Sequence, residues 1–170
     1  MYIGPMYSGK TSKLVSVYKK YLLNNIQPLV INYIGDDRYP EYETHMSTHD
    51  GLKIPCKRCE TLKEINMDEH DIILINEGQF FKDLKDCVID LVTNKQKQVY
   101  VAGLDGDFQQ NPIGDILYLI PFADKVVKLS AICRCTSKAI FSHRLTSETS
   151  QICIGSTNYI PLCRKCLKNI

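Results

Sequence analysis

The segment GPMYSGKT, from Gly4 to Thr11, constrains the fold of this 170-residue chain more than any other stretch. It matches the pattern G-x-x-x-x-G-K-[ST], in which backbone N–H groups close around phosphate oxygens and the following helix presents its positive end. In such a loop Lys10 reaches the β- and γ-phosphates, and the hydroxyl of Thr11 binds Mg²⁺. The simpler alternative is a glycine-rich turn before a helix. The predicted phosphate-binding residues are Gly4, Pro5, Met6, Tyr7, Ser8, Gly9, Lys10 and Thr11.

The residues around this loop predict an α/β fold. Apolar side chains recur at helical spacing directly after the loop: Leu14, Val17, Tyr18, Tyr21 and Leu22. A short strand is expected before the loop, and others at residues 29–34, 53–59, 71–76, 98–103 and 124–130, with a further helix at 82–94. Strands that alternate with helices indicate a mostly parallel sheet with helices on both faces. We therefore expect a P-loop, RecA-like nucleotide-binding domain over residues 1–130.

One predicted strand ends in two polar residues. The aliphatic run Ile72–Ile75 reads as a fully buried strand, and Asn76 and Glu77 follow it directly. Ligands of open α/β sheets bind at the carboxyl ends of the strands, so we expect this pair to lie beside the phosphate loop. Glu77 is then a candidate to contact a hydroxyl acceptor. Taken alone, it is equally well explained as a solvated loop acid.

Eight cysteines without an export signal predict thiols or metal ligands rather than disulfides. Four of them form two pairs near the C-terminus: Cys133 with Cys135, and Cys163 with Cys166. Two such pairs suggest Zn²⁺ held by four thiolates, in a second domain over residues 131–170. Cys56 and Cys59 form a rival pair with better spacing. Spacing alone leaves open which pair joins Cys163 and Cys166.

Charge and hydropathy narrow the class of protein. The net charge is +2, and residues 131–170 carry six basic residues and one acid. A basic C-terminal segment is compatible with a zinc-ribbon protein that binds nucleic acid. These charges, however, are scattered rather than clustered. No run approaches the roughly 18 apolar residues that could span a bilayer, and the first motif follows Met1 almost at once. We therefore expect a cytoplasmic protein with no membrane partner and no signal peptide.

Six segments read together identify a family. GPMYSGKT, DDRY, STHDG, INEGQFF, GLDGDFQ and CRKC occur in this order, and with them the chain resembles the type II (cellular-type) thymidine kinases, above all the poxviral members. The resemblance covers Ile3 to about Leu167. It implies transfer of the γ-phosphoryl group of ATP to the 5′-hydroxyl of thymidine, with deoxyuridine also accepted, in nucleotide salvage. It further implies a homotetramer or dimer, and the host cytoplasm if the protein is viral.

The resemblance implies roles for residues at matching positions. Glu77 matches the general base, and Lys10 keeps its role in the phosphate loop. Arg38 and Asp36 match residues that flank the transferring phosphoryl group and its metal. The implied Mg²⁺ site comprises Thr11, Asn76 and Asp36, and Asp36 also counts among the ATP-binding residues.

The resemblance also implies a nucleoside pocket and its support. The implied thymidine-binding residues are Met6, Phe80, Leu104, Phe108, Gln151, Ile152, Cys153, Ile154, Gly155 and Tyr159. Residues 151–155 match the family's lasso loop, whose backbone groups bond to the base. The family's zinc-bearing lobe anchors this loop, which favours Cys133, Cys135, Cys163 and Cys166 as the zinc ligands over the rival pair.

The chain departs from the family's pattern at three places. Asn76 stands where the family usually has an aspartate, which predicts weaker Mg²⁺ binding. The first C-terminal cysteine pair is separated by one residue, and the lasso segment GSTNY is one residue short with Asn158 in place of an acid. These departures motivate the alternative of a catalytically weak relative that binds nucleotide.

Overall fold

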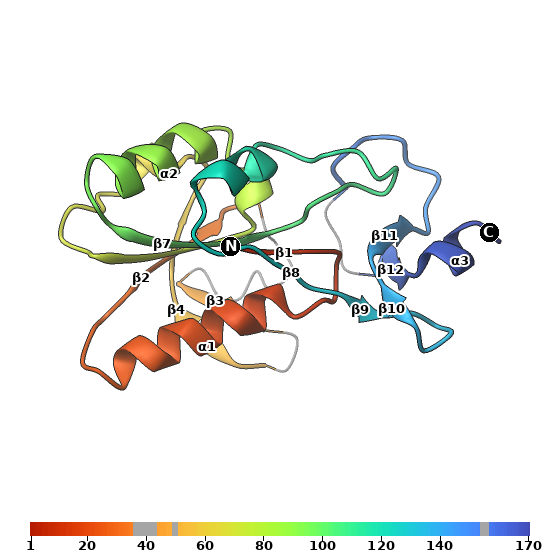
Figure 1. Ribbon diagram of the computed structural model, residues 1–170, viewed down its shortest axis with the longest axis horizontal. Helices are drawn as coiled ribbons and strands as arrows, with labels where there is room; N and C mark the ends of the chain where they lie inside the picture. Colours follow the sequence, from red (N-terminus) through yellow and green to blue (C-terminus); the bar gives the residue numbers. More distant parts are fainter. Residues whose placement is uncertain (36–43, 49–50, 154–156) are drawn as a thin grey trace.

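A parallel sheet forms the centre of the molecule. The computed structural model describes residues 1–35, 44–48, 51–153 and 157–170. Within these ranges six strands lie in the order β5-β2-β6-β7-β1-β8, and every neighbouring pair is parallel. The strands are β1 (Tyr2–Ile3), β2 (Leu29–Tyr33), β5 (Lys57–Cys59), β6 (Ile72–Asn76), β7 (Gln98–Gly103) and β8 (Val127–Lys128). Helix α1 (Lys10–Leu22) covers one face and α2 (Leu84–Thr93) the other (Figure 1), which confirms the predicted α/β class.

Strand β6 supplies apolar side chains to both faces of the sheet, because successive side chains of a strand alternate in direction. Ile73 and Ile75 pack in the same cluster as Leu84 of α2, whereas Leu74 packs in the cluster that contains Leu14 of α1. All five side chains are fully buried. Each such burial contributes about 1.5–3 kcal/mol of stability. Burial on both faces explains the uninterrupted aliphatic run of this strand.

Helix α1 begins immediately after the phosphate loop. Gly9 occupies the N-cap position with φ 80°, a left-handed conformation that favours glycine, and the first turn of the helix contains no acidic residue. The positive end of the helix dipole is therefore directed at the loop without a competing carboxylate in that turn. Leu14 and Tyr18 of the predicted apolar stripe are buried, but Leu22 is 39% exposed at the end of the helix.

The predicted strand over residues 53–59 is two strands. β4 (Lys53–Pro55) pairs antiparallel with β3 (His45–Ser47), whereas β5 continues parallel to β2 in the main sheet. The chain changes partners at Cys56, whose backbone N–H donates to the carbonyl oxygen of Thr44. Pro55 has no backbone N–H, and proline is confined to edges and ends of strands. The other predicted strands are present, although β8 is shorter than expected.

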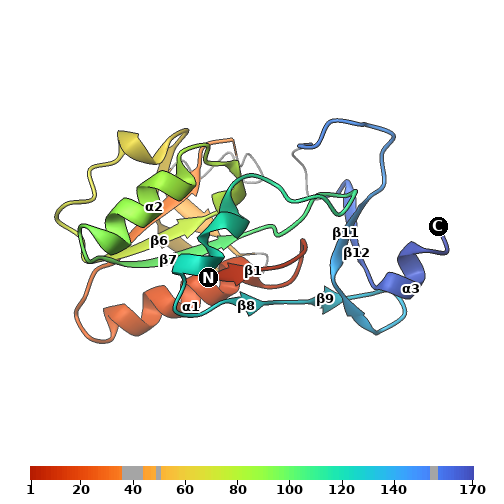
Figure 2. The same cartoon turned by 45° about the horizontal axis from the view of Figure 1, so that its top comes forward.

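The C-terminal residues pack around a small cluster of their own. β9 (Ala131–Ile132) pairs with β10 (Lys138–Ala139), β11 (Phe141–Arg144) pairs with β12 (Tyr159–Leu162), and α3 (Arg164–Leu167) follows. The 3-10 helices elsewhere in the described residues are η1 (Leu62–Glu64), η2 (Gly78–Phe80) and η3 (Ile116–Phe122). Figures 1 and 2 show the C-terminal strands at one end of the main sheet, beside the segments that follow β1 and β7.

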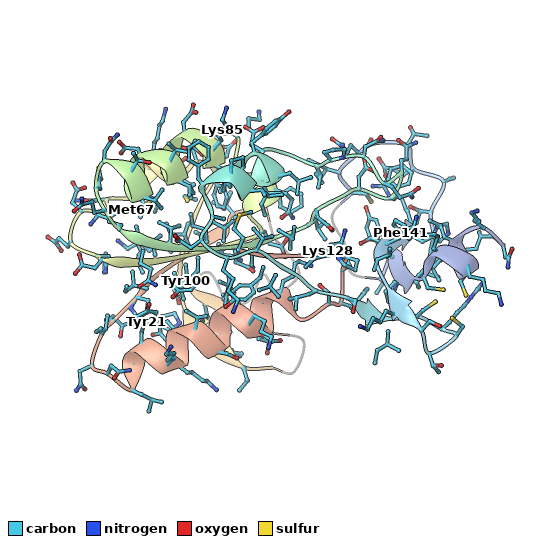
Figure 3. All side chains as sticks on the ribbon, in the orientation of Figure 1. Tyr21, Met67, Lys85, Tyr100, Lys128 and Phe141 are labelled. Carbon is cyan, nitrogen blue, oxygen red and sulfur yellow. The ribbon has the colours of Figure 1, made fainter. Side chains whose placement is uncertain are left out.

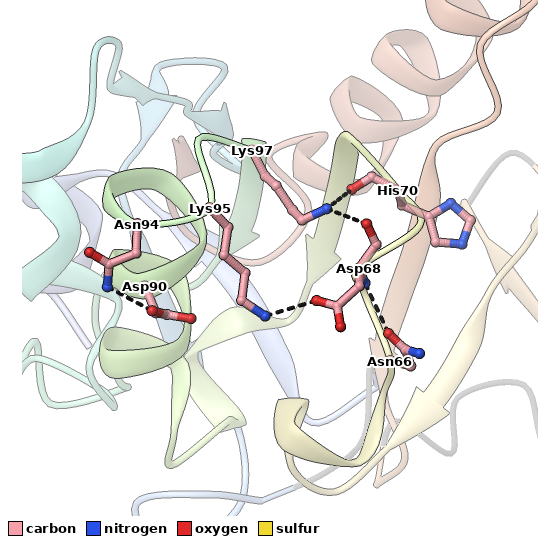
Figure 4. A network of polar contacts seen from close by, with 7 residues as sticks. All are labelled: Asn66, Asp68, His70, Asp90, Asn94, Lys95 and Lys97. Atoms are coloured by element: carbon pink, nitrogen blue, oxygen red, sulfur yellow. Dashed lines mark hydrogen bonds and ion pairs between the residues drawn. The ribbon is translucent and has the colours of Figure 1, made fainter.

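Polar contacts brace the amino ends of β6 and β7, away from these segments. Lys97 Nζ donates to the carbonyl oxygens of Asp68 at 2.7 Å and His70 at 2.9 Å (Figure 4). On the side of α1, the hydroxyls of Tyr21 and Tyr100 lie 3.0 Å apart (Figure 3).

None of the helices in the described ranges has the length and apolar character needed to cross a bilayer.

Candidate active site

The phosphate loop directs two side chains at one of its own carbonyl groups. Gly4 has φ 149°, and a Cβ at this position would lie 2.5 Å from the carbonyl oxygen of Leu129, so the loop requires glycine here. Lys10 Nζ donates to the carbonyl oxygen of Pro5 at 2.7 Å, and Ser8 Oγ donates to the same oxygen at 2.8 Å. Lys10 is buried. Its ammonium group therefore lies within the loop, where P-loop proteins bind phosphate oxygens.

Asn76 joins the end of β6 to the phosphate loop. Its Oδ1 accepts a hydrogen bond from the Thr11 hydroxyl at 3.3 Å, and its Nδ2 donates to Oδ1 of Asn32 on β2 at 2.9 Å. Both asparagines are buried. The hydroxyl and amide oxygens of this group are hard donors of the kind that Mg²⁺ prefers. Asn76 therefore lies beside the phosphate loop, as predicted.

Glu77 is held beside the same loop in a strained conformation. It has φ 54° and ψ 40°, a left-handed conformation that costs a non-glycine residue about 1–3 kcal/mol and that concentrates at functional sites. Gln79 Nε2 donates to Glu77 Oε2 at 2.8 Å, and Gln79 Oε1 accepts from the backbone N–H of Leu104 at 2.9 Å. Glu77 and Gln79 are both buried. The carboxylate is therefore oriented by an amide that is itself anchored to the segment after β7.

One cavity unites the phosphate loop, Glu77 and the C-terminal segment. Residues 6–12 line it on the side of the loop. The other lining residues are Gly35, Ser47, Glu77, Phe80, Leu104, Gly106, Asp107, Phe108, Ile113, Ser142, Gln151, Ile152, Cys153 and Tyr159. A phosphate-binding loop, two carboxylates (Glu77 and Asp107) and the aromatic side chains of Phe80, Phe108 and Tyr159 thus line one shared space. Pockets of this kind combine apolar walls with a few placed polar groups.

The cavity contains most of the predicted site residues. The described residues predicted to contact thymidine all line it: Met6, Phe80, Leu104, Phe108, Gln151, Ile152, Cys153 and Tyr159. Of the predicted phosphate-binding residues, those from Met6 to Thr11 line it, whereas Gly4 and Pro5 do not. Asn76 lies behind Thr11 and does not line the cavity. The predicted residues Asp36, Arg38, Ile154 and Gly155 lie outside the described residues.

Some residues that organise the cavity were missed by sequence reasoning. Asp107 Oδ1 accepts from the backbone N–H groups of Gln109 at 2.8 Å and Asn111 at 2.9 Å, and its Oδ2 accepts from Gln151 Nε2 at 2.9 Å. Ser142 Oγ on β11 accepts from the backbone N–H of Met6 at 2.9 Å. For Asp107, its place in the motif GLDGDFQ was the sequence signal that could have pointed to it. Ser142 has no comparable signal, because its partner lies 136 positions away.

Four cysteine side chains gather between β9, β10 and α3. Their sulfur atoms all lie within 4.8 Å of one another, and the members are Cys133, Cys135, Cys163 and Cys166. Hydrogen bonds from Ser137 lower the pKa of the Cys135 thiol to about 6, which favours the thiolate, the form that binds metals, whereas hydrogen bonds to Cys135 and Cys133 raise the pKa of the Cys166 thiol to about 12 while no metal ion is bound. Four thiolates at this spacing suit Zn²⁺. The cluster is therefore a candidate structural metal centre.

The rival cysteine pair is arranged differently. Cys59 packs in the core cluster on the face of the sheet covered by α2, whereas Cys56 packs against the cluster on the face covered by α1. Burial among apolar side chains raises the pKa of the Cys59 thiol to about 12. In the part of the chain that the structure describes, the group of potential metal ligands is the C-terminal one.

The parallel sheet, with a phosphate loop between β1 and α1 and a cavity at its carboxyl edge, defines a P-loop nucleotide-binding protein. A family model described as thymidine kinase matches residues 1–167. The chain therefore belongs to the thymidine kinase family, which confirms the resemblance inferred from its motifs.

Individual relatives agree with this assignment. The chain is 40% identical over 168 residues to the thymidine kinase of Yaba monkey tumor virus (strain VR587), covering 96% of this chain and 91% of that protein. It is 40% identical over 171 residues to the thymidine kinase of monkeypox virus, covering 96% and 93%. The thymidine kinase of vaccinia virus (strain Ankara) is 39% identical over 170 residues, with the same coverage.

Proposed function

We propose that the protein transfers the γ-phosphoryl group of ATP to the 5′-hydroxyl of thymidine, giving dTMP and ADP. The observation that carries the proposal is that Lys10, Glu77 and the aromatic side chains Phe80, Phe108 and Tyr159 line one cavity. These groups are of the kinds needed to contact the phosphates of a donor, the hydroxyl of an acceptor and the flat face of a nucleoside base. Family membership supports the same reaction.

In this reaction Glu77 accepts the proton of the 5′-hydroxyl while the hydroxyl oxygen forms a bond to the γ-phosphorus. The bond between the γ-phosphorus and the bridging oxygen breaks, and its electron pair leaves with ADP. Lys10 moves from the Pro5 carbonyl to the phosphate oxygens, and Arg38 is the predicted second cation. Gln79 keeps the Glu77 carboxylate oriented toward the acceptor.

The residues proposed to hold Mg²⁺ are Thr11 and Asn76, with Asp36 as the predicted third. When bound, Mg²⁺ neutralises charge on the phosphate oxygens. The hydroxyl of Thr11 and the amide oxygen of Asn76 provide oxygen donors. Because neither carries a charge, this chain is proposed to bind the ion more weakly than a chain with an aspartate at position 76.

On the acceptor side, Tyr159 and Phe108 are proposed to pack against the base, and backbone groups of residues 151–155 to bond to its edge. Met6, Phe80 and Leu104 would complete the pocket. In an apolar pocket, the loss of one methyl group from the base changes binding only modestly. Deoxyuridine is therefore proposed as a second acceptor.

Three further properties are proposed from the family. Zn²⁺ would be held by Cys133, Cys135, Cys163 and Cys166 and would stabilise the C-terminal residues 131–170 as a domain beside residues 1–130. The protein would assemble as a homotetramer or a dimer. It would work in nucleotide salvage in the cytoplasm, or in the host cytoplasm if it is viral.

The test is phosphoryl transfer by the purified protein with ATP and Mg²⁺. Thymidine should yield dTMP and ADP in equal amounts, and 5′-deoxythymidine, which lacks the acceptor hydroxyl, should yield none. Deoxycytidine serves as a control for base selection. Nucleotide binding without turnover on any deoxynucleoside would overturn the proposal and favour the catalytically weak relative that Asn76 motivates.

A nucleic-acid-binding function is the remaining alternative. Its affinity for DNA would fall steeply as salt rises, because each phosphate contact releases counterions. We expect no such binding, and salt-sensitive DNA binding without thymidine phosphorylation would replace the proposed function.

A further inference from the structure

Arg144, the last residue of β11, is a buried arginine whose guanidinium group contacts three backbone carbonyls and a phenol. Nη1 donates to the carbonyl oxygens of Glu148, at 2.9 Å, and Ser150. Nη2 donates to the carbonyl oxygen of Gln151 at 3.1 Å. Nε and Nη2 both donate to the Tyr159 hydroxyl, at 3.0 and 2.6 Å. One side chain therefore holds residues 148–151 against β12.

The same guanidinium group also lies against two aromatic rings. Its Cζ is 3.9 Å from the ring centroid of Phe108 and 5.2 Å from that of Tyr159. Both rings line the cavity, whereas Arg144 does not. A planar cation that packs on an aromatic face is attracted to the electrons of the ring, and arginine suits this arrangement better than lysine. Arg144 thus supports the wall of the cavity from behind.

Further hydrogen bonds make the arrangement continuous with the rest of the cavity. The Tyr159 hydroxyl, which accepts from Arg144, donates to the carbonyl oxygen of Cys153 at 3.1 Å. Gln151 Nε2 donates to Asp107 Oδ2 at 2.9 Å and to the carbonyl oxygen of Pro112 at 3.2 Å. The segment from residue 148 to 153 is therefore tied to β11 and β12 on one side and to the loop after β7 on the other.

We propose that Arg144 is a positioning residue for the nucleoside acceptor. It sets the places of Phe108, Tyr159 and the segment 148–153, and it contacts neither substrate. This inference rests on the proposed function, because it names Phe108 and Tyr159 as the walls of the acceptor site. It assigns Arg144 no part in binding ATP, which is proposed to bind at the phosphate loop.

The test compares Arg144→Met with Arg164→Met. Arg164 is an exposed arginine of α3 whose guanidinium group lies over Phe141, a ring outside the cavity lining, so the control removes a similar contact from the same part of the fold. Arg144→Met should raise KM for thymidine on the order of tenfold or more, because it removes several hydrogen bonds to a charged group, while KM for ATP stays within about twofold. Arg164→Met should leave both constants within about twofold.

Two measurements separate positioning from loss of the fold. Zinc content should be the same in both variants, since Arg144 is not a metal ligand. Without substrates, hydrogen exchange in a peptide covering residues 145–153 should be faster in Arg144→Met than in Arg164→Met, while peptides of β6 stay protected. Arg144→Lys keeps the charge but not the planar fork, and its KM for thymidine should lie between those of the wild type and Arg144→Met.

The outcomes distinguish this inference from the proposed function. A wild-type protein that does not phosphorylate thymidine overturns the function, and the exchange measurement then decides whether Arg144 positions the segment. A wild type that is active, with an unchanged KM for thymidine in Arg144→Met, overturns the inference alone. A parallel rise of both Michaelis constants with loss of zinc also overturns it, because Arg144 would then be a general structural residue.

Discussion

The hydroxyl of Thr11 donates to the amide oxygen of Asn76 across 3.3 Å, and this contact joins the phosphate loop to the end of β6. Asn76 in turn donates to Asn32 on the neighbouring strand. The three side chains form a neutral hydrogen-bonded chain in the place proposed for Mg²⁺. Its neutrality leads to the first prediction.

Asn76→Asp should lower the half-saturating Mg²⁺ concentration for thymidine phosphorylation several-fold. A restored charge near the ion contributes on the order of 1 kcal/mol. Asn32 Oδ1 accepts from the Asn76 amide, so in Asn76→Asp the Asn32 amide would have to turn to donate to the new carboxylate. Mg²⁺ titration of activity in the two proteins checks this, with Asn76→Ala as a variant that should need more Mg²⁺ than the wild type. If the wild-type and Asn76→Asp titrations coincide, Asn76 has no influence on the metal.

Glu77→Gln should lower kcat by about a hundredfold or more, because an amide cannot accept the proton of the acceptor hydroxyl. Binding of ATP should remain nearly unchanged, since the phosphate loop is intact. Steady-state kinetics and direct measurement of ATP binding check the two parts. Unchanged turnover would remove Glu77 from the mechanism.

Gln79→Met should lower kcat roughly tenfold without changing KM for ATP, because misplacement of a catalytic group slows the reaction without removing it. Methionine fills a similar volume but cannot donate to Glu77 or accept from the backbone of Leu104. The double variant with Glu77→Gln provides the control. If Gln79 acts through Glu77, its loss should have little further effect once Glu77 is replaced.

Cys163→Ser should abolish stoichiometric zinc binding and raise KM for thymidine, since zinc thiolates supply folding energy to the segment that carries Tyr159. Cys56→Ser and Cys59→Ser should retain one zinc per chain. Metal analysis of the purified variants checks this. Release of zinc by the Cys56 or Cys59 variant, with retention in variants of Cys133 and Cys135, would reverse the assignment of the ligands.

Leu74→Ala should lower the free energy of unfolding by about 2–5 kcal/mol, because it leaves a cavity in the cluster between β6 and α1. Leu23→Ala makes the same substitution at a side chain that is 85% exposed, and it should change stability by less than about 0.5 kcal/mol. Denaturant unfolding of the two variants provides the comparison. Equal losses of stability would contradict the placement of β6 at the centre of the core.

Local patterns were sufficient to predict the class of fold and the nature of the loop. The spacing of Gly4, Gly9 and Lys10 is a property of eight consecutive residues, and the aliphatic run of β6 reports burial on both faces. Both signals can be read from a short stretch of sequence, because backbone conformation and the alternation of side chains depend on residues that are close in the sequence. The ordered motifs together also identified the family.

Local sequence patterns did not predict which distant partner a segment pairs or packs with. Residues 53–59 have the composition of one strand, but β4 pairs with β3 while β5 pairs with β2. The choice of cysteines was similar. Spacing left Cys56 and Cys59 open as metal ligands, and the resemblance to the family favoured the C-terminal group. In the structure, Cys56 and Cys59 pack in two different clusters, away from that group.

The sequence placed the end of β6 beside the phosphate loop, but the particular contacts that organise the cavity were decided by the tertiary structure. Thr11 meets Asn76 across 65 positions, Asp107 meets Gln151 across 44, and Ser142 meets Met6 across 136. No periodicity connects such pairs, because their proximity follows from the order of strands in the sheet and the packing of the C-terminal strands beside it. The sequence supplied the phosphate loop, the carboxylate and the aromatic residues, and the packing of the chain brought them to one cavity.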